Sequence, residues 1–320
     1  MSQVITLTLN PAIDRILEIP DFHVGGVLSV KESRTYPAGK GVNVARTLSC
    51  LDKEVLAMGI VGLEDEPFFN TVSTDYLAVD WILKEGSTRV NLTINDPLNA
   101  TETHIRAVTH DAGEFPLQEL KEKLVRHYHD GDLVVLSGSL PANAPEDTLY
   151  QLGRFCGDRQ IPTIIDSSGK AMTRALEAAP FLIKPNVEEL QEITGNTYNT
   201  DLEIARAAQE LASHFHINIV IVSMGKEGAL AFDRIKHKAY RAKLAFDEQM
   251  EDALHAVGSG DAMIGGICSG LVENENLEMI LRKGMAAGAA NLFTEAPGVI
   301  SANLFKQLVH QVVLYEMNLD

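Results

Sequence analysis

A glycine turn that opens into an apolar helix is the segment of this sequence best suited to chemistry. Gly258, Ser259 and Gly260 precede Asp261, and the small or apolar residues 262–266 follow. Glycines let backbone amides come close to an anion, and the positive end of the helix dipole points at the same place. A carboxylate there can meet a substrate hydroxyl beside a phosphate. An ordinary capped helix is the alternative, since aspartate is common at helix starts.

A second glycine turn enters a helix in the same way and adds a cation. Lys40 follows Gly39 and can pair with an anionic group as a point charge. Asn43, one turn later, can donate to and accept from sugar hydroxyls. The GxxxxGK[ST] spacing of a Walker phosphate loop is missing. The segment therefore indicates either a sugar and phosphate site or a plain loop-to-helix junction.

Polar residues follow the first strand-like run and recur on a later strand. Asn10 and Asp14 come after residues 4–9, and the carboxyl ends of strands in open α/β sheets face the ligand crevice. Arg89 and Asn91 lie two apart on a predicted strand, so they share a face. A guanidinium beside an amide suits a phosphate, while a carboxylate suits neutral hydroxyls. A solvated surface position is the alternative for each residue.

Further turns contain residues suited to a nucleotide. Lys184, Asn186 and Glu189 lie where a buried strand runs into a helix, and an acid beside a triphosphate would hold hydrated magnesium. Asn186 and Glu189 also have the spacing of a helix capping box, which is the alternative. Ser139 ends another buried strand. The turn after the most apolar strand could contact phosphate oxygens or form a plain hairpin; its residues are Ser223, Gly225, Lys226 and Gly228.

The elements that position these turns alternate between strand and helix from about residue 40 onward. Such alternation predicts a mostly parallel sheet with helices on both faces. Continuous apolar strands such as residues 219–222 fit this arrangement, because both of their faces would be covered. The predicted helices cover residues 40–51, 117–127, 145–155, 172–178, 201–215, 262–272, 277–293 and 303–315.

Two stretches break this alternation and are rich in strand patterns. Residues 12–36 and 85–108 predict one small antiparallel sheet, inserted into the main domain. A sheet of this kind suits a lid that excludes water, and Arg106 on it could assist Arg89 with a phosphate. Its exposed face is also where two subunits often pair, so we expect a homodimer through the lid. The main domain comprises residues 1–11, 37–84 and 109–320.

Composition excludes several functional classes. The formal charge of −17 argues against nucleic acid, because duplex binding depends on Lys and Arg neutralising phosphates. Cys50, Cys156 and Cys268 form no CxxC pair, which fits unpaired thiols in a reducing compartment. No segment approaches 18 apolar residues, so we expect a cytoplasmic protein without membrane contact. The closely spaced histidines lack a nearby third metal ligand and are expected at the surface: His127, His129, His214 and His216.

With these residues assembled, the chain resembles the PfkB carbohydrate kinase family. The likeness runs through almost the whole chain and is most specific at residues 8–14, 38–45, 136–141, 184–190 and 257–261. Within the family it is similar to the sugar-phosphate kinases of the 1-phosphofructokinase and tagatose-6-phosphate kinase type. The resemblance implies a ribokinase-like three-layer α/β/α sandwich with a small antiparallel β lid, and it implies ATP and Mg²⁺ as cofactors.

The reaction implied by the resemblance is transfer of the ATP γ-phosphoryl group to a hydroxyl of a phosphorylated ketose. Fructose 1-phosphate, giving fructose 1,6-bisphosphate, is the expected acceptor, with tagatose 6-phosphate or fructose 6-phosphate as alternatives. A sensor that binds ATP and a sugar phosphate without turnover is the alternative from another class. Because an aspartate at a helix N-terminus should ionise readily, Asp261 is expected to be a weak base that takes the proton late.

The resemblance also implies roles residue by residue. Asp261 would be the catalytic base, and the amides of Gly258, Ser259 and Gly260 the anion hole. The acceptor side would comprise Asn10, Asp14, Gly39, Lys40, Asn43 and Asn91, with Arg89 and Ser139 on the existing phosphate. The ATP side would comprise Lys184, Asn186, Ser223, Gly225, Lys226, Gly228 and Asn291, with Glu189 on magnesium.

Some residues depart from the family pattern. His255 and Ala256 stand where Asn followed by Ser or Thr is usual, Ser259 replaces an alanine, and Ala262 replaces a commoner serine. Residues 101–104 read Thr-Glu-Thr-His where related kinases tend to have Thr-Glu-Ile-Asn and a glycine run. We expect these departures to affect the choice of sugar rather than the reaction.

Overall fold

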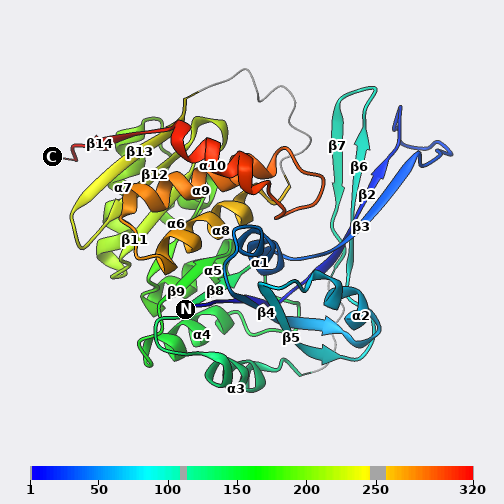
Figure 1. The fold of residues 1–320 in the computed structure, drawn as a ribbon, viewed down its shortest axis with the longest axis horizontal. Coiled ribbons are helices and arrows are strands. Elements are labelled where there is room, and N and C mark those ends of the chain that lie inside the picture. Colours follow the sequence, from blue (N-terminus) through cyan, green and yellow to red (C-terminus); the bar gives the residue numbers. More distant parts are fainter. Residues whose placement is uncertain (1, 109–113, 246–256, 320) are drawn as a thin grey trace.

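A ten-stranded sheet runs through the body of the protein. In the computed structural model, which describes residues 2–108, 114–245 and 257–319, the strand order is β14-β13-β12-β11-β10-β9-β8-β1-β4-β5 (Figure 1). Strands β11 to β5 along this order are parallel, and β12, β13 and β14 continue the sheet antiparallel. The bounds are β1 (Val4–Thr8), β4 (Val55–Gly62), β5 (Leu77–Lys84), β8 (Leu133–Ser137), β9 (Thr163–Asp166), β10 (Leu182–Ile183), β11 (Ile219–Ser223), β12 (Ala229–Asp233), β13 (Lys238–Leu244) and β14 (Val312–Met317).

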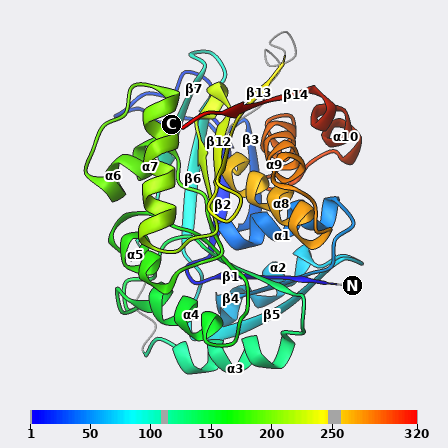
Figure 2. The ribbon, with the colours of Figure 1, turned by 90° about the vertical axis from the view of Figure 1, so that its left-hand side faces the viewer.

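Helices cover both faces of this sheet, because its buried strands send alternate apolar side chains to two cores. In β8, Val134 and Leu136 belong to one core, whereas Leu133 and Val135 belong to the other. Figure 2 shows the two helical layers on opposite sides of the strands. The first core packs under α3 (Leu117–His127), α4 (Thr148–Gly157), α5 (Gly169–Ala175), α6 (Val187–Thr194) and α7 (Asp201–His214). The second packs under α1 (Lys40–Cys50), α2 (Glu66–Phe69), α8 (Ser259–Val272) and α9 (Leu277–Asn291).

A smaller sheet of four strands projects from the body, at the right of Figure 1. Its order is β3 (Glu32–Ala38), β2 (Ala12–Glu18), β6 (Val90–Asp96) and β7 (Thr101–Ile105). The outer pairs β2–β3 and β6–β7 are antiparallel, as expected for the lid, while the central pair β2–β6 is parallel. The lid therefore joins the two stretches that the sequence singled out, and β2 starts only a few residues after the end of β1.

The last predicted helix, residues 303–315, was wrong in its last four residues. Helix α10 (Ala302–Gln311) ends at Gln311, and the residues that follow form β14, which pairs with β13 at the edge of the main sheet. Val312 begins this strand with 1% exposure, and β-branched and aromatic side chains here favour an extended chain. Helices α4 and α5 also start at different residues from those predicted, at Thr148 and Gly169.

Candidate active site

Asp261 lies on the first turn of α8, directly after the glycine turn, and is nearly buried, at 8% exposure. Its Oδ2 accepts a hydrogen bond of 2.8 Å from Nδ2 of Asn43, on the first turn of α1. Gly258 caps α8 in a left-handed conformation, with φ of 86°. A Cβ atom there would lie 2.9 Å from Oδ1 of Asn291, so the turn requires glycine.

The surroundings of Asp261 raise the pKa of its carboxyl to about 6. Burial is the main cause, and the nearby Asp166 adds to it, while Lys40 and the Asn43 hydrogen bond act in the opposite direction. The expectation that Asp261 ionises readily was therefore wrong in direction. Burial outweighs the helix dipole, and the raised pKa makes Asp261 a stronger base than predicted.

Two lysines meet at a buried carboxylate beside the glycine turn. Nζ of Lys40 lies 3.2 Å from Oδ2 of Asp166, and Nζ of Lys184 lies 3.5 Å from Oδ1. Asp166 is only 2% exposed, and although burial opposes its ionisation, Lys184 and Lys40 lower its pKa. Nζ of Lys184 is 3.7 Å from the position of a Cβ atom on Gly260, so positive charge adjoins the turn before Asp261.

The sequence analysis missed Asp166. The signal was available, because Asp166 is the last residue of the apolar strand β9 and therefore lies at the same sheet edge as Asn10. Its charge also helps to raise the pKa of Lys40, together with Asp261 and Glu189, against the effect of burial. Lys40, predicted for the acceptor side, thus lies near Asp261, the predicted base, and near Glu189 of the predicted ATP side.

The predicted acceptor residues line a cavity of about 380 Å³ between the lid and the body. Asn91 donates from Nδ2 to Asp14 over 2.9 Å, and burial raises the pKa of Asp14 despite this bond and the nearby arginines. Asn10 donates to Oγ of Ser139 over 3.1 Å. The cavity lining joins both lid and body residues, including Asn10, Asp14, Gly39, Lys40, Asn43, Arg89, Asn91, Ser139, Gly258 and Asp261.

Arg89 makes backbone contacts that the sequence did not predict, and its phosphate contact stays a prediction. Arg89 precedes β6, and its Nε and Nη2 donate to the carbonyl oxygens of Pro11 and Asn10 over 3.2 and 3.0 Å. Its Nη1 lies 3.5 Å from the carbonyl oxygen of Ala107. The guanidinium therefore ties the end of β1 to both halves of the lid, although the residue still borders the cavity.

For the residues predicted to bind ATP, both structural alternatives occur: a helix capping box and a hairpin. Asn186 and Glu189 form a capping box, with Asn186 N donating to Glu189 Oε2 over 2.9 Å and Glu189 N to Asn186 Oδ1 over 2.7 Å. Ser223 ends β11, and the hairpin to β12 contains Gly225 and Gly228, both with positive φ, around an exposed Lys226. The capping box holds the start of α6, and the hairpin joins β11 to β12. The contacts predicted between these residues and phosphate oxygens stay predictions.

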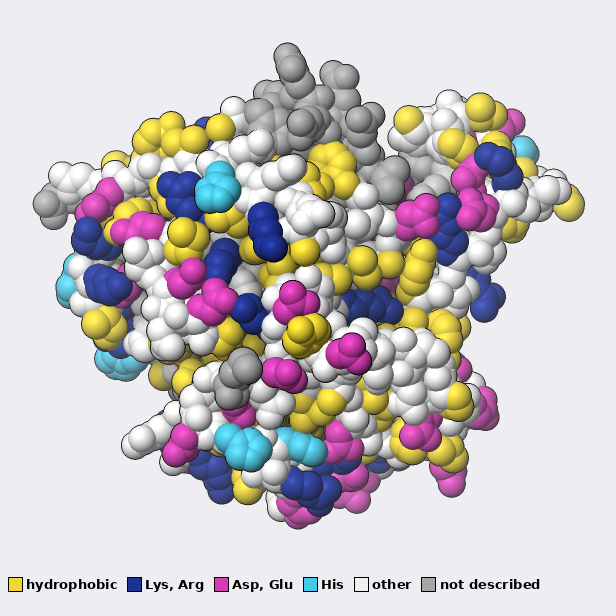
Figure 3. Space-filling model, in the orientation of Figure 1, with side chains coloured by type: hydrophobic (Ala, Val, Ile, Leu, Met, Phe, Trp, Pro, Cys, Tyr) yellow, Lys and Arg dark blue, Asp and Glu magenta, His cyan; other side chains and the backbone are white. Residues whose placement is uncertain are grey.

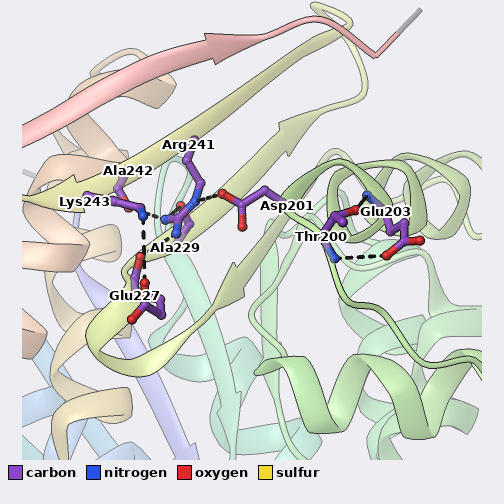
Figure 4. A network of polar contacts seen from close by, with 8 residues as sticks. All are labelled: Thr200, Asp201, Glu203, Glu227, Ala229, Arg241, Ala242 and Lys243. Atoms are coloured by element: carbon purple, nitrogen blue, oxygen red, sulfur yellow. Dashed lines mark hydrogen bonds and ion pairs between the residues drawn. The ribbon is translucent and has the colours of Figure 1, made fainter.

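A buried arginine that the sequence analysis did not single out holds this hairpin in place (Figure 4). Arg241 on β13 is 5% exposed and donates to the carbonyl oxygens of Glu227 and Ala242 over 2.6 and 2.7 Å. Its Nε also donates to Asp201, at the start of α7, over 2.6 Å. The turn after β11 is therefore anchored to two neighbouring elements.

Asn291 does not reach the cavity. It is fully buried, and its Nδ2 donates to Thr294, Ala296 and Val299 in the loop after α9. Its Oδ1 adjoins Gly258 and accepts no hydrogen bond among the described atoms, so its predicted place near the nucleotide stays a prediction. The unusual His255 and Ala256 lie outside the described residues. Oγ of Ser259 is buried without a partner among the described atoms, which suits a ligand at this turn.

The described part of the chain contains no cluster of three or more His, Cys, Asp or Glu side chains that could hold a metal ion. His127 instead bonds to Asp80, at 2.7 Å. The three cysteines are unpaired. Within the same residues, no helix is long and apolar enough to cross a membrane. Figure 3 shows lysines and arginines mixed with acidic side chains over the described part of one face, without a continuous basic patch.

Known proteins similar to this chain agree with these features. The family model described as pfkB family carbohydrate kinase matches residues 6–302. The chain is 30% identical over 310 residues to the 1-phosphofructokinase of Bacillus subtilis, covering 97% of this chain and 98% of that protein. It is 29% identical over 322 residues to a tagatose-6-phosphate kinase of Staphylococcus epidermidis, covering 98% and 100%.

Solved structures give the same picture. The crystal structure of phosphofructokinase-2 from Escherichia coli in complex with potassium matches with a TM-score of 0.89 at 27% identity, covering 97% of this chain and 99% of that chain. A structure described as the tetrameric inhibited form of the same enzyme matches with a TM-score of 0.87, at the same identity and coverage.

Proposed function

Because the chain belongs to the pfkB family of carbohydrate kinases, we propose that it transfers the γ-phosphoryl group of ATP to a hydroxyl of a phosphorylated ketose. Fructose 1-phosphate is the proposed acceptor and fructose 1,6-bisphosphate the product. One observation carries the proposal: a buried carboxylate, Asp261, lies at a helix N-terminus beside Lys40 and Lys184, at the edge of a cavity that the lid covers.

Asp261 acts as the base of this reaction. Asn43 occupies Oδ2, so Oδ1 is the oxygen that accepts the acceptor hydroxyl. A pKa of about 6 leaves the group mostly ionised at neutral pH yet able to take a proton as the bond to phosphorus forms. Phosphoryl transfer has a loose transition state, so the base mainly orients the hydroxyl.

The donors around Asp261 suit the charge that develops on the transferred phosphoryl group. The first amides of α8 have no partner within the helix, and Lys184 adjoins them at Gly260. Fixed donors and cations of this kind stabilise a transition state without reorganisation. Lys40, paired with Asp166, adds a second positive charge on the acceptor side.

Magnesium would neutralise the triphosphate and help to orient it. Glu189 is the residue that fits this role, because its Oε2 accepts the capping bond and Oε1 accepts no hydrogen bond from a described residue. One carboxylate together with phosphate oxygens and water is a usual donor set for Mg²⁺. The backbone N–H of Asn186 fixes the orientation of that carboxylate, and Asn186 Oδ1 in turn accepts from Glu189 N.

The acceptor is the finer part of the proposal. Support for a phosphorylated ketose comes from the cationic cavity and from the names of the two relatives, 1-phosphofructokinase and tagatose-6-phosphate kinase. Tagatose 6-phosphate and fructose 6-phosphate are the alternatives within this class. A binding protein without turnover is the alternative outside it, and the buried base beside two lysines argues against that alternative.

An ADP-release assay over fructose 1-phosphate, fructose 6-phosphate, tagatose 6-phosphate, fructose and ribose tests the proposal. We expect the highest kcat/KM with fructose 1-phosphate. A higher value for another sugar phosphate would transfer the assignment to that sugar. Absence of turnover with every sugar, alongside measurable ATP binding, would favour the sensor.

We further propose that residues 12–36 and 85–108 act as a lid and as the surface through which two subunits pair. Residues 12–36 and 85–108 carry exposed apolar side chains, among them Val24, Val27 and Leu98. The tetramer described for the E. coli enzyme belongs to that protein, but it makes self-association a reasonable expectation here. A cytoplasmic location stays a prediction.

A further inference from the structure

The hairpin between β11 and β12 has few side-chain contacts of its own to hold it in place. Residues 224–228 connect the two strands, and none of residues 225–227 is buried. Its internal bonds are those of one tight turn, in which Met224 N donates to Gly228 O over 2.8 Å and Gly228 N donates to Gly225 O over 3.0 Å. Turns with few buried contacts open at low cost in free energy. The position of the hairpin therefore depends on neighbouring elements.

Arg241, on β13, supplies contacts from the buried side of the hairpin (Figure 4). Its Nη2 donates to the carbonyl oxygen of Glu227 over 2.6 Å, and its Nη1 lies 2.7 Å from the carbonyl oxygen of Ala242 and 3.3 Å from that of Ala229. Its Nε donates to Oδ2 of Asp201, which ties the same guanidinium to the start of α7. Because the guanidinium is buried, these charge-assisted bonds form away from water, where they are stronger.

Gly228 closes the hairpin directly against this guanidinium. Its φ of 99° and ψ of −132° belong to a region that residues with a Cβ atom rarely adopt. A Cβ atom there would overlap the carbonyl oxygen of Ala242 and would lie 3.0 Å from Nη1 of Arg241. The bond to Glu227 O also fixes the peptide group that precedes Gly228. Arg241 therefore sets the conformation of the turn as well as its position.

The strand end from which the hairpin starts contacts the segment that carries Glu189. The backbone N of Ser223 donates to the carbonyl oxygen of Pro185 over 3.0 Å. Ser223 and Asn186 also form an isolated parallel bridge. The backbone N–H of Asn186 in turn orients the carboxylate of Glu189. The hairpin therefore starts next to the residue proposed to hold magnesium and, through it, the triphosphate.

We propose that Arg241 is a positioning residue for ATP, acting through the β11–β12 hairpin rather than through contact with the nucleotide. This inference rests on the proposed function, because it assumes that ATP lies along residues 223–228. If the hairpin moves freely, only a fraction of the molecules presents it correctly, and the apparent Kd for ATP rises by the inverse of that fraction. None of residues 223–228 lines the acceptor cavity, so the effect is selective for the nucleotide.

Equilibrium binding of a non-hydrolysable ATP analogue to Arg241→Met tests the inference. Methionine is long and adaptable, so it fills the space of the arginine stem while it removes every bond to the hairpin. We expect Kd for the analogue and KM for ATP to rise about 10-fold or more, whereas Kd for fructose 1-phosphate should change less than about twofold. Arg241→Lys keeps the charge and some donors and should restore part of the affinity. It also provides the comparison if Arg241→Met does not fold.

Two control variants separate positioning from general destabilisation. Arg234→Met removes a comparable arginine at the opposite end of these strands, where Nε donates to Ile217 O over 3.1 Å and Nη2 donates to Asn218 Oδ1 over 2.8 Å. Asp201→Asn removes the charge of one partner but leaves the bonds to the carbonyl oxygens. Both should bind the analogue within about twofold of the wild type. Hydrogen exchange of backbone amides 224–228, followed by mass spectrometry, should accelerate in Arg241→Met and not in either control.

The outcomes separate this inference from the proposed function. If the wild type binds the analogue without kinase turnover and Arg241→Met weakens that binding selectively, the proposed function is wrong and the positioning role stands. If the wild type turns over but Arg241→Met binds the analogue like Arg234→Met, the positioning role is wrong and the function stands. Equal losses of affinity for the analogue and for fructose 1-phosphate would show that Arg241 serves only the stability of the fold. A wild type that does not bind the analogue would overturn both.

Discussion

Asn43 and Asp261 lie 218 positions apart in the sequence, yet the amide of one donates directly to the carboxylate of the other. The bond joins the first turns of α1 and α8, the two helices that follow the glycine turns. Because it favours the charged form of Asp261, it partly offsets the burial that raises the pKa of that group. The bond also leaves one defined oxygen for the acceptor.

Replacement of Asp261 by asparagine should abolish most of the turnover. The amide keeps the shape of the carboxylate but cannot accept the hydroxyl proton, so we expect kcat to fall by ~10²-fold or more. The Kd for ATP, measured by calorimetry, should stay within about twofold, since no binding contact to ATP is assigned to this side chain. A variant with near-normal kcat would rule out Asp261 as the base.

Removal of the Asn43 side chain should change the pH dependence of kcat. Without its donor, Asp261 loses a bond that favours ionisation, so its pKa rises and the acidic limb of the profile moves to higher pH. The measurement is kcat between pH 5 and 9 for wild type and Asn43→Ala. Asn91→Ala is the control, because it removes the same kind of bond from Asp14 and should leave the profile of kcat in place. Equal shifts in both variants would contradict this role.

Asp261 should also make stability depend on pH. Its pKa is about 6 in the folded protein against an ordinary value of 3.8, so the folded state binds more protons between these values and stability falls as pH rises through that window. Asp261→Asn removes this penalty. At pH 7.5 its free energy of unfolding should exceed that of the wild type by at most about 3 kcal/mol, and the difference should shrink towards pH 4. Urea unfolding at both pH values checks the sign.

Loss of the charge on Asp166 should destabilise the fold. Asp166→Asn leaves two ammonium groups of Lys40 and Lys184 next to each other without their shared partner, at a cost of about 3–5 kcal/mol when a buried pair is broken. Because the pKa of Asp166 is lowered, its contribution is present above its unfolded pKa and disappears as pH falls through the folded value. Asp158→Asn, at an exposed pair, is the control and should have little effect.

Position 258 of the glycine turn before Asp261 should tolerate no side chain. Gly258→Ala places a Cβ atom 2.9 Å from Oδ1 of Asn291 at a positive φ, so both strain and a clash result. Gly195→Ala is a matched control, since Gly195 has φ of 71° and open space around it. We expect about 1–2 kcal/mol of destabilisation in the control and more in Gly258→Ala, together with a loss of kcat only in the latter. Thermal unfolding and the ADP-release assay measure the two effects.

The sequence predicted the turns before α1 and α8 well because each of them combines a glycine with a helix start. It could not predict which side chains meet across the sheet, such as Lys40 and Lys184 at Asp166, because those contacts depend on strand order. The use of Arg89 was also hidden, since nothing local shows that its donors reach the backbone of residues 10 and 11.

The two other misjudgements have different physical causes. The ionisation of Asp261 was misjudged because the helix dipole is visible in the sequence whereas burial is not. The end of α10 was misjudged because residues 312–317 have a pattern that helix and strand share. Pairing with β13, which only the folded sheet supplies, selects the strand.

The lid strand β2 carries Asp14, whereas Asp261 belongs to the body. Under the proposed function, the acceptor would bridge two parts of the protein, and its affinity would depend on the position of the lid. Sugar binding and lid closure are thermodynamically linked. If closure of the lid strengthens sugar binding by a certain free energy, sugar binding stabilises the closed lid by the same free energy. If the lid acts as proposed, an acceptor that does not hold it closed would let water compete for the phosphoryl group beside Asp261. The rate of ATP hydrolysis without transfer to the sugar, measured with poor acceptors, should therefore report how well each sugar fits the site.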